Sequence, residues 1–405
     1  MSWPVVKLSD VAELINGDRS SNYPSGEDIV EEGILFLSTK NIVENKIDLS
    51  QKSFITKEKF NSLGRGKLLK NDLIITLRGT LGSCCIFNTE YDTGFINAQM
   101  MIIRCKDEVS NRYLHYYLTS LRVNCEFQRA NTGSAVPQLT GRQLAELEIP
   151  LPPLNEQKRI AAILDKADAI RRKRQLAIQL ADDFLRSVFL DMFGDPVINP
   201  KGWGFKKINS ITTDWRGGAP FKPDDFTDEG VNVLHKGAIQ RNNNVLIDTK
   251  KKTYTSEAFA KKYKKSEVDQ SFLAVTLRDL VPSGPSIGLI SNLKGSIGKN
   301  YILAQGAYGF KCKENLVKPS YLVYLTNNNS FRSTLSKYWV GSTQIHIRTP
   351  IFKEIEIPIP PINIQDEFEK VVKKHRTQFN KSLETIAGSE ALFNSLSQKA
   401  FAGEL

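Results

Sequence analysis

Four basic side chains follow predicted strands and are the first candidates for contact with an anionic partner. Arg78 and Arg278 each end a Thr-Leu-Arg tripeptide, and Lys40 and Lys236 follow a second pair of apolar runs. A guanidinium placed there can direct two parallel N–H donors at guanine O6 and N7 or at a phosphate. The alternative is a solvated strand end or a structural ion pair. Of the four, the arginine pair is the best candidate.

Two polar turns, at 132–138 and 340–346, supply the other candidates for this interface. Exposed hydroxyl, amide and backbone N–H groups can contact phosphates or base edges. The alternative is that the loops are kept for their turn geometry. The selected side chains are Ser134, Gln138, Ser342 and His346.

Signatures of catalysis and metal binding are missing from the sequence. Leu151-Pro152-Pro153-Leu154 has leucine on both sides of the prolines, where amino-methyltransferases have Asp, Asn or Ser before them and an aromatic residue after. Gly64-Arg65-Gly66-Lys67 lacks the full spacing of a phosphate-binding loop. The histidines form no metal-ligand pattern, so we predict no metal site. A nuclease site of scattered carboxylates remains an alternative, although a duplicated chain should show it twice.

The chain repeats itself over a long interval. Glu148–Gln157 reads EIPLPPLNEQ and Glu356–Gln365 reads EIPIPPINIQ, a shift of 208 residues (from 148 to 356). Nearer the start of each copy, Thr76 corresponds to Thr276 at a shift of 200 residues (from 76 to 276). Shifts of this size indicate a duplicated domain and not a solenoid. The candidate side chains are therefore expected on two similar surfaces.

Each copy combines a strand-rich part with a helical part, which predicts an α/β (α+β) fold. Apolar runs bounded by turn residues predict strands. These runs are Gly33–Leu37, Asp72–Leu77, Val231–Leu234 and Ser271–Thr276. Short amphipathic helices are predicted at Tyr113–Leu121 and Tyr321–Thr326.

A proline-rich strap and a long helix follow the strand-rich part. Ile149–Pro153 must be extended, because each proline fixes φ and disfavours helix at the preceding residue. Asn155 stands where an N-cap belongs, so a helix is predicted from about Glu156 to Phe193. The same pattern returns up to Phe401 in the second copy. The predicted segments are 1–147, 148–195, 196–355 and 356–405.

Apolar residues in both helices recur at steps of three and four, the pattern of a coiled coil. Two antiparallel helices with residue 157 opposite residue 401 would place Arg174 opposite Glu384 and Arg171 opposite Ala387. A buried arginine needs such an acidic neighbour; the alternative is that these arginines lie at the edge of the seam in water. The candidate seam residues are Ile160, Leu164, Arg174, Ile178, Leu185, Phe368, Phe379, Glu384, Ile386 and Phe393.

Composition points to a polyanionic partner. The net charge is +11 and the pI is about 9.2. Lysine and arginine that neutralise phosphates release condensed counterions and so favour binding to nucleic acid. The sequence contains no apolar run of the ~20 residues that span a bilayer and no pattern of a signal peptide. The expected location is the cytoplasm.

With these features together, the chain resembles the specificity subunits of Type I restriction-modification enzymes. The residues that carry the resemblance are the strap Ile149–Gln157, the helix segment Ile160–Asp165, the return of both at 357–401, and the ending Ala400–Leu405. The resemblance covers the whole chain. It implies two target recognition domains, at 1–147 and 196–355, held apart by two antiparallel helices that begin at the central and C-terminal straps.

The resemblance also implies the partners. Each domain would read one half of a bipartite double-stranded DNA target, and two modification subunits would dock on the helical seam. Those subunits methylate adenine N6 with S-adenosylmethionine, and restriction subunits add cleavage driven by ATP and Mg²⁺. This chain would itself bind no cofactor, perform no catalysis and associate with the nucleoid.

The strand-rich parts differ strongly between the copies while the helices keep one register, which favours an asymmetric target with a fixed spacing. Two alternatives remain: a non-catalytic DNA-binding scaffold of another modification or defence complex, and a nuclease in its own right.

Overall fold

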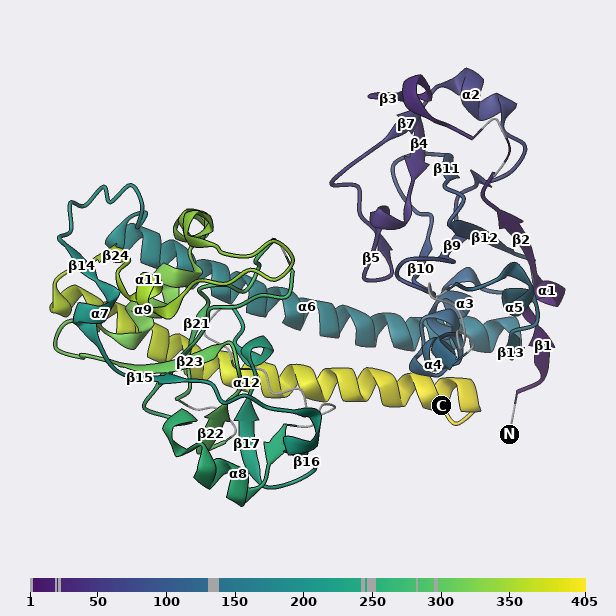
Figure 1. Ribbon diagram of the computed structural model, residues 1–405. Helices are drawn as coiled ribbons and strands as arrows, with labels where there is room; N and C mark the ends of the chain where they lie inside the picture. Colours follow the sequence, from purple (N-terminus) through teal and green to yellow (C-terminus); the bar gives the residue numbers. More distant parts are fainter. Residues whose placement is uncertain are drawn as a thin grey trace. The chain divides into compact units, whose positions relative to one another are not determined.

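The structure is a computed structural model that describes residues 3–18, 20, 23–129, 138–241, 245, 253–281, 283–294 and 298–405, without the side chains of residues 178 and 376–387. Its contacts divide the chain into two compact units. Unit 1 comprises Met1–Gln175 and Glu384–Leu405, and unit 2 comprises Leu176–Leu383 (Figure 1). Each unit therefore contains part of both long helices.

Two larger sheets and the two-stranded pairs β1-β13 and β5-β6 form the strand-rich part of unit 1. Its strands are β1 (Val5–Lys7), β2 (Ala12–Asn16), β3 (Ile29–Val30), β4 (Ile34–Leu37), β5 (Ile42–Val43), β6 (Lys46–Ile47), β7 (Phe54–Ile55), β8 (Lys67–Leu68), β9 (Leu73–Thr76), β10 (Cys84–Ile86), β11 (Gly94–Ile96), β12 (Met100–Cys105) and β13 (Glu148–Pro150). The antiparallel sheet has the order β10-β9-β12-β2. The mixed sheet has the order β3-β7-β4-β11-β8, with β4 and β11 parallel.

Unit 2 repeats this topology, except that β5 and β6 have no counterpart among its described strands. Its strands are β14 (Phe205–Lys207), β15 (Thr212–Gly217), β16 (Phe226–Thr227), β17 (Val231–Leu234), β18 (Tyr254–Thr255), β19 (Glu267–Asp269), β20 (Leu273–Thr276), β21 (Ile290–Asn292), β22 (Asn300–Leu303), β23 (Ala307–Cys312) and β24 (Glu356–Pro358). The orders are β15-β23-β20-β21 and β16-β18-β17-β22-β19, with β17 and β22 parallel. The predicted duplication and the predicted α/β character are confirmed.

Short helices cover the sheets, and two long helices, α6 and α12, complete the units. The α-helices are α1 (Leu8–Val11), α2 (Lys57–Ser62), α3 (Asn111–Leu118), α4 (Leu121–Arg129), α5 (Gly141–Ala145), α6 (Leu154–Phe193), α7 (Ile208–Ile211), α8 (Glu257–Lys262), α9 (Pro319–Asn327), α10 (Asn329–Thr334), α11 (Thr349–Lys353) and α12 (Ile362–Ala402). The 3-10 helices are η1 (Gly26–Asp28), η2 (Thr39–Asn41), η3 (Pro223–Asp225), η4 (Lys236–Ala238), η5 (Lys264–Ser266) and η6 (Leu335–Tyr338). Hydropathy along the described helices stays below that of a bilayer-spanning segment.

Both long helices were predicted, but the N-cap of α6 was placed wrongly. The helix begins at Leu154, so Asn155 lies inside its first turn. The Pro153 carbonyl accepts hydrogen bonds from Glu156 N (2.9 Å) and Gln157 N (3.0 Å) and so starts the helix. A proline can do this because helix formation there uses its carbonyl, and its missing N–H is not required.

A buried glutamine at the end of each strap makes the same contacts in both copies. The Gln157 side chain accepts from Ser110 N (2.8 Å) and donates to Glu108 O (3.0 Å) and Pro152 O (2.9 Å). Gln365 makes the same three contacts in unit 2, with Lys318 N (2.8 Å), Leu316 O (3.2 Å) and Pro360 O (2.8 Å). We call each set of three bonds a glutamine clamp. It fixes the start of a long helix to the loop before α3 or α9.

The described apolar seam residues lie in the cores of the units or pack against them. Ile160 and Leu164 of α6 belong to the core of unit 1 together with Ala400 of α12, and Phe393 packs against it. Leu185 and Phe368 belong to the core of unit 2. Within each unit, opposite ends of α6 and α12 therefore pack together, as antiparallel helices require.

The predicted arginine contacts in the seam are only partly visible. Arg174 is half-buried, whereas the side chains of Ile178, Phe379, Glu384 and Ile386 lie outside the described part of the structure. Arg171 was expected opposite Ala387, but its guanidinium lies over the Phe393 ring at 4.9 Å. Its carboxylate partner is Asp168 on its own helix, at 2.6 Å. The flexible Arg171 side chain thus contacts a carboxylate and an aromatic ring. Neither belongs to the residue that the predicted antiparallel register places opposite Arg171.

Candidate nucleic-acid interface

Backbone pairing places Arg78 at an exposed end of β9. Leu77 N donates to Gln99 O (2.8 Å), and Leu139 N donates to Leu77 O (2.9 Å). Hydrogen bonds on both sides thus hold the residue before Arg78, which is itself exposed. The backbone from which the long Arg78 side chain extends is therefore held firmly in place.

Arg278 occupies the matching place in unit 2. Leu277 N donates to Gly306 O (3.2 Å), and Ile347 N donates to Leu277 O (2.9 Å). The arginine is half-buried here. The two predicted arginines therefore occupy equivalent ends of β9 and β20.

Each arginine is paired with a glutamine. Arg78 Nη2 donates to Gln138 Oε1 at 2.7 Å, and Arg278 Nη2 donates to Gln344 Oε1 at 2.7 Å. Neither arginine forms an ion pair with a carboxylate in the described residues. Of the predicted residues, Gln138 is thus brought to Arg78, whereas Gln344 was not selected from the sequence.

The segment 340–346 is a hairpin that presents Gln344. Val340 N donates to His346 O (2.9 Å), and His346 N donates to Val340 O (3.0 Å). Gly341 has φ +103°, and a β-carbon there would lie 2.2 Å from Gln344 O. Only glycine fits this turn without strain. Gly341 thus permits the turn geometry from which the Gln344 side chain extends.

The remaining turn candidates are distributed differently. His346 forms a backbone bridge with Arg278, as Gln138 does with Arg78. Ser342 is exposed on the hairpin at 340–346. Ser134 lies outside the described residues. Gln138 and His346 thus occupy equivalent backbone positions, at the predicted shift of 208 residues. The Gln138 side chain contacts its arginine, whereas in unit 2 Gln344 makes that contact.

The two candidate lysines are not structurally equivalent. Lys40 is the exposed middle residue of η2, whereas Lys236 is the half-buried first residue of η4. A β-carbon at Gly306 would lie 3.3 Å from both Lys236 Cδ and Arg278 Cβ, so these two stems converge. Burial and the neighbouring Arg278 lower the pKa of Lys236, opposed by Asp279. Unit 2 thus brings two cationic side chains together at one strand end.

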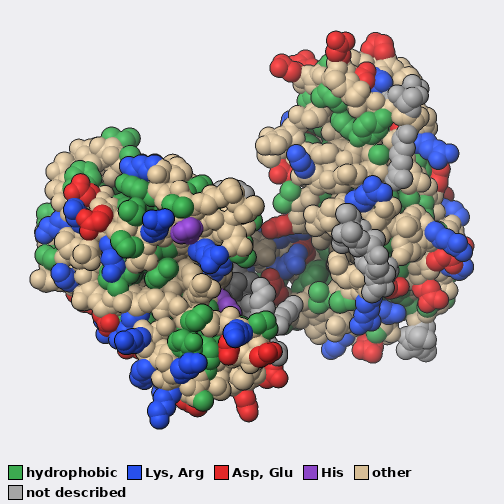
Figure 2. Space-filling view, viewed as in Figure 1, with side chains coloured by type: hydrophobic (Ala, Val, Ile, Leu, Met, Phe, Trp, Pro, Cys, Tyr) green, Lys and Arg blue, Asp and Glu red, His purple; other side chains and the backbone are tan. Residues whose placement is uncertain are grey.

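Lysines also gather away from the strand ends. Lys and Arg side chains crowd the part of unit 2 that contains α8, as Figure 2 shows. Lys261, Lys264 and Lys299 line a cavity of 800 Å³ there, together with Glu257 and Glu267, and Lys264 pairs with Glu267. Solvated positive charge of this kind can attract a polyanion without selecting a sequence.

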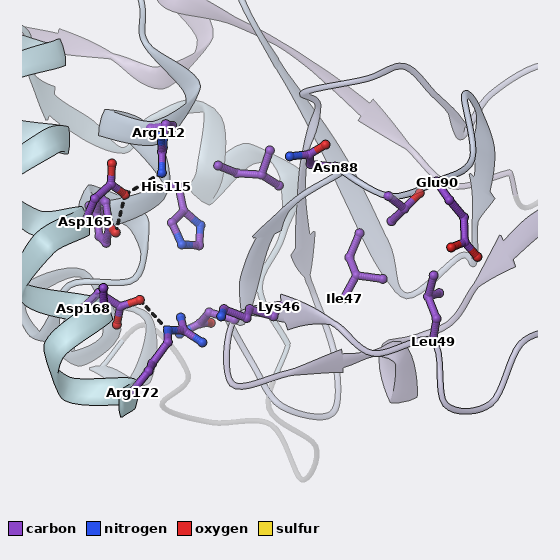
Figure 3. A pocket seen from close by; sticks show the side chains of 15 residues that line it. Lys46, Ile47, Leu49, Asn88, Glu90, Arg112, His115, Asp165, Asp168 and Arg172 are labelled. Atoms are coloured by element: carbon purple, nitrogen blue, oxygen red, sulfur yellow. Dashed lines mark hydrogen bonds and ion pairs between the residues drawn. The ribbon is translucent and has the colours of Figure 1, made fainter. Parts of the chain in front are cut away.

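Unit 1 contains a second polar site, a cavity of 710 Å³ between α3, α6 and the β5–β6 hairpin. Asp165 pairs with Arg112 (2.8 Å) and accepts from Tyr116 Oη (2.8 Å). Asp168 pairs with Arg172. In Figure 3 these pairs line one side of the cavity, and Lys46, Ile47 and Glu90 line the other. Each aspartate therefore has an arginine as its ion-pair partner.

His115 lies within this network, between the Arg112–Asp165 and Asp168–Arg172 pairs (Figure 3). Its Nδ1 is buried and has no hydrogen-bond partner among the described residues. Burial lowers the pKa of His115 to about 4. The imidazole is therefore neutral near pH 7.

His, Cys, Asp and Glu side chains form no cluster of three or more suited to a metal ion within the part of the chain that the structure describes.

Known proteins resemble the chain over nearly its whole length. A family model described as the Type I restriction modification DNA specificity domain matches residues 1–180 and 200–386. The Type I restriction enzyme MjaVIII specificity subunit of Methanocaldococcus jannaschii is 23% identical over 411 residues, covering 95% of this chain and 91% of the relative. The EcoKI specificity subunit of Escherichia coli K12 is 20% identical over 431 residues, covering 100% and 89%.

Solved structures share the fold. The Type I restriction-modification S subunit from M. genitalium superposes with a TM-score of 0.53 at 15% identity, covering 99% of this chain and 96% of that one. A chain from a study of complex assembly and conformational transition of the type I R-M system gives 0.50 at 17% identity, covering 100% and 98%. Since the family model matches both copies of the repeat, the chain belongs to the family of Type I restriction-modification DNA specificity subunits.

Proposed function

We propose that this specificity subunit reads an asymmetric, bipartite target in double-stranded DNA, with one half-site for each unit. The observation that carries the proposal is that both units place an Arg–Gln pair at the same strand end within different surroundings. Arg78 is exposed, whereas Arg278 is half-buried beside Lys236. Because the two units share a fold but surround the Arg–Gln pair with different side chains, we expect them to read two half-sites of different sequence.

The long helices are proposed to dock two modification subunits. Leu176, Leu180 and Phe184 follow one another at intervals of four on α6 and are 54%, 59% and 53% exposed. Apolar side chains at this spacing share one helix face, and an exposed apolar stripe favours a protein partner. Restriction subunits are proposed to join the same complex.

Catalysis is assigned to these partners. The modification subunits would use S-adenosylmethionine to methylate adenine N6, and the restriction subunits would use ATP and Mg²⁺. This chain would supply recognition and spacing only, without a cofactor of its own.

Methylome mapping tests the proposal. The chain is expressed with its modification subunit in a host that lacks other adenine methyltransferases, and N6-methyladenine is mapped across the genome. We expect a single motif with two defined half-sites separated by a spacer of constant length. A host that expresses the modification subunit alone is the control and should show no such motif.

Other outcomes would identify a different function. Methylation at one uninterrupted site, or none, would contradict the bipartite reading and favour a DNA-binding scaffold. Cleavage of DNA by the purified chain without partners would instead identify a nuclease.

A further inference from the structure

The Arg–Gln pairs of the two units are alike although their glutamines come from different positions in the repeat. Gln138 bridges Arg78 through its own backbone, and the residue that bridges Arg278 is His346. The glutamine of unit 2 is Gln344, two residues earlier, yet both Nη2–Oε1 distances are 2.7 Å. Two loops of different register thus form the same side-chain contact, which indicates that the contact itself matters.

The arginine of each pair has more donors than its glutamine oxygen uses. A guanidinium has N–H donors and no acceptor, and a glutamine amide has one acceptor oxygen. Because that oxygen accepts from one Nη2, the other N–H groups of the guanidinium can serve a further acceptor. Its complement is a surface with adjacent acceptors: guanine presents O6 and N7 in the major groove, whereas adenine presents N7 beside an N6 donor.

Phosphate oxygens are acceptors too, but a phosphate does not need a guanidinium of fixed plane. Exposed lysines such as Lys40 supply positive charge without orientation. A neutral amide adds no charge to Arg78 or Arg278; it fixes the direction of the guanidinium. Orientation is what a bidentate contact to a base edge requires.

The geometry points to Gln138 and Gln344 as positioning residues that hold Arg78 and Arg278 for contact with guanine, one in each half-site. This inference rests on the proposed function, because it needs two half-sites. It assigns specificity in unit 2 to Gln344 in addition to the arginine.

The test uses the complex with the modification subunit and compares methylomes of Gln138→Leu and Gln344→Leu. We expect Gln344→Leu to relax the guanine requirement at one position of one half-site by about tenfold or more. Gln138→Leu should relax one position of the other half-site. Gln344→Glu keeps an oxygen that accepts from Arg278 and should retain the guanine requirement. Ser336→Ala, an exposed change on η6 just before the hairpin, is the matched control and should leave the motif unchanged.

Several outcomes would overturn the inference while leaving the proposed function intact. One is a wild-type bipartite motif without guanine in either half-site. Another is an unchanged motif in both leucine variants, with weaker binding to all sequences and a smaller salt dependence, as expected of a phosphate contact. An unchanged motif with only a lower melting temperature would show a structural role. If the wild-type complex yields no bipartite motif, the proposed function itself fails.

Discussion

A largely buried imidazole, with its Nδ1 fully buried, distinguishes unit 1 from unit 2 at a matched position. His115 lies on α3, and the residue 208 positions later is Val323 on α9. Both helices are otherwise anchored alike, since Tyr113 Oη donates to Pro150 O (2.6 Å) and Tyr321 Oη donates to Pro358 O (2.5 Å). The histidine is thus a local difference within a shared framework.

We predict that His115 makes unit 1 sensitive to acid. The folded-state pKa of about 4 lies below the ordinary value of 6.5, mainly through burial and the charges of Arg172 and Arg112, opposed by Asp168 and Asp165. Between these values the unfolded chain binds the proton more readily, so the stability that neutral His115 preserves is lost as pH falls from 6.5 through 4. At pH 4.5 the loss should be roughly 2 kcal/mol.

Hydrogen exchange at pH 7 and pH 4.5 measures this effect. In the wild type, α3 should lose more protection than α9, which carries Val323. His115→Val should remove most of that difference, because valine cannot take up a proton. Equal acid sensitivity of α3 in the wild type and the variant would assign the effect to other groups.

Each glutamine clamp connects a strap, a loop and the start of a long helix. Gln157 and Gln365 are fully buried, and each makes three hydrogen bonds to backbone groups. Removing such a side chain leaves buried backbone groups unpaired, at a cost of about 1–3 kcal/mol for each unsatisfied group. The clamps should therefore stabilise each unit by several such contacts.

We predict that Gln157→Leu lowers the unfolding free energy of unit 1 by at least about 2 kcal/mol. Gln365→Leu should do the same in unit 2. Gln175→Leu, an exposed change on the same helix as Gln157, is the control and should have little effect. Thermal unfolding with unit-resolved hydrogen exchange measures the outcome, and destabilisation of both units by either variant would contradict it.

Helices and straps that have a local sequence signal could be predicted from the sequence. Side-chain contacts that depend on the geometry of a turn could not. The strap and α6 were predictable because proline restricts the chain locally and the apolar period marks a helix. The start of α6 was wrong because the Pro153 carbonyl begins the helix in place of an Asn155 side chain. Gln344 was missed because its approach to Arg278 depends on the hairpin that Gly341 permits, which residue spacing does not reveal.

Across the whole molecule, each unit is completed by the final part of a long helix. In unit 2 that part is the end of α6, where Phe193 O accepts from Trp203 Nε1 (2.9 Å). In unit 1 it is the end of α12, where Ala400 O accepts from Trp3 Nε1 (3.1 Å). The duplicated chain thus uses the same construction twice, once with an internal segment and once with its last residues.

Removing residues 384–405 should therefore destabilise unit 1 and spare unit 2. The Phe401 ring lies 5.5 Å from that of Tyr113 and 5.0 Å from that of Tyr117, and it closes a core that includes Ile160 and Leu164. Loss of one buried phenylalanine alone costs about 3–5 kcal/mol. We expect α3 to lose hydrogen-exchange protection while α9 keeps it.

A chain that lacks only Gly403–Leu405 is the control for this truncation. It keeps Phe401 and Ala400, so α3 should remain protected, although the contact of Arg159 with Leu405 O (2.9 Å) and the packing of the partly buried Leu405 side chain against the core are lost. Exposed ion pairs and hydrogen bonds at a chain end contribute little to stability. If the short deletion exposes α3 as much as the long one, the final residues and not the apolar end of α12 complete unit 1. If the long deletion exposes α9 as much as α3, the two units do not unfold independently. The proposal that the end of α12 stabilises unit 1 alone, and the end of α6 unit 2 alone, would then be wrong.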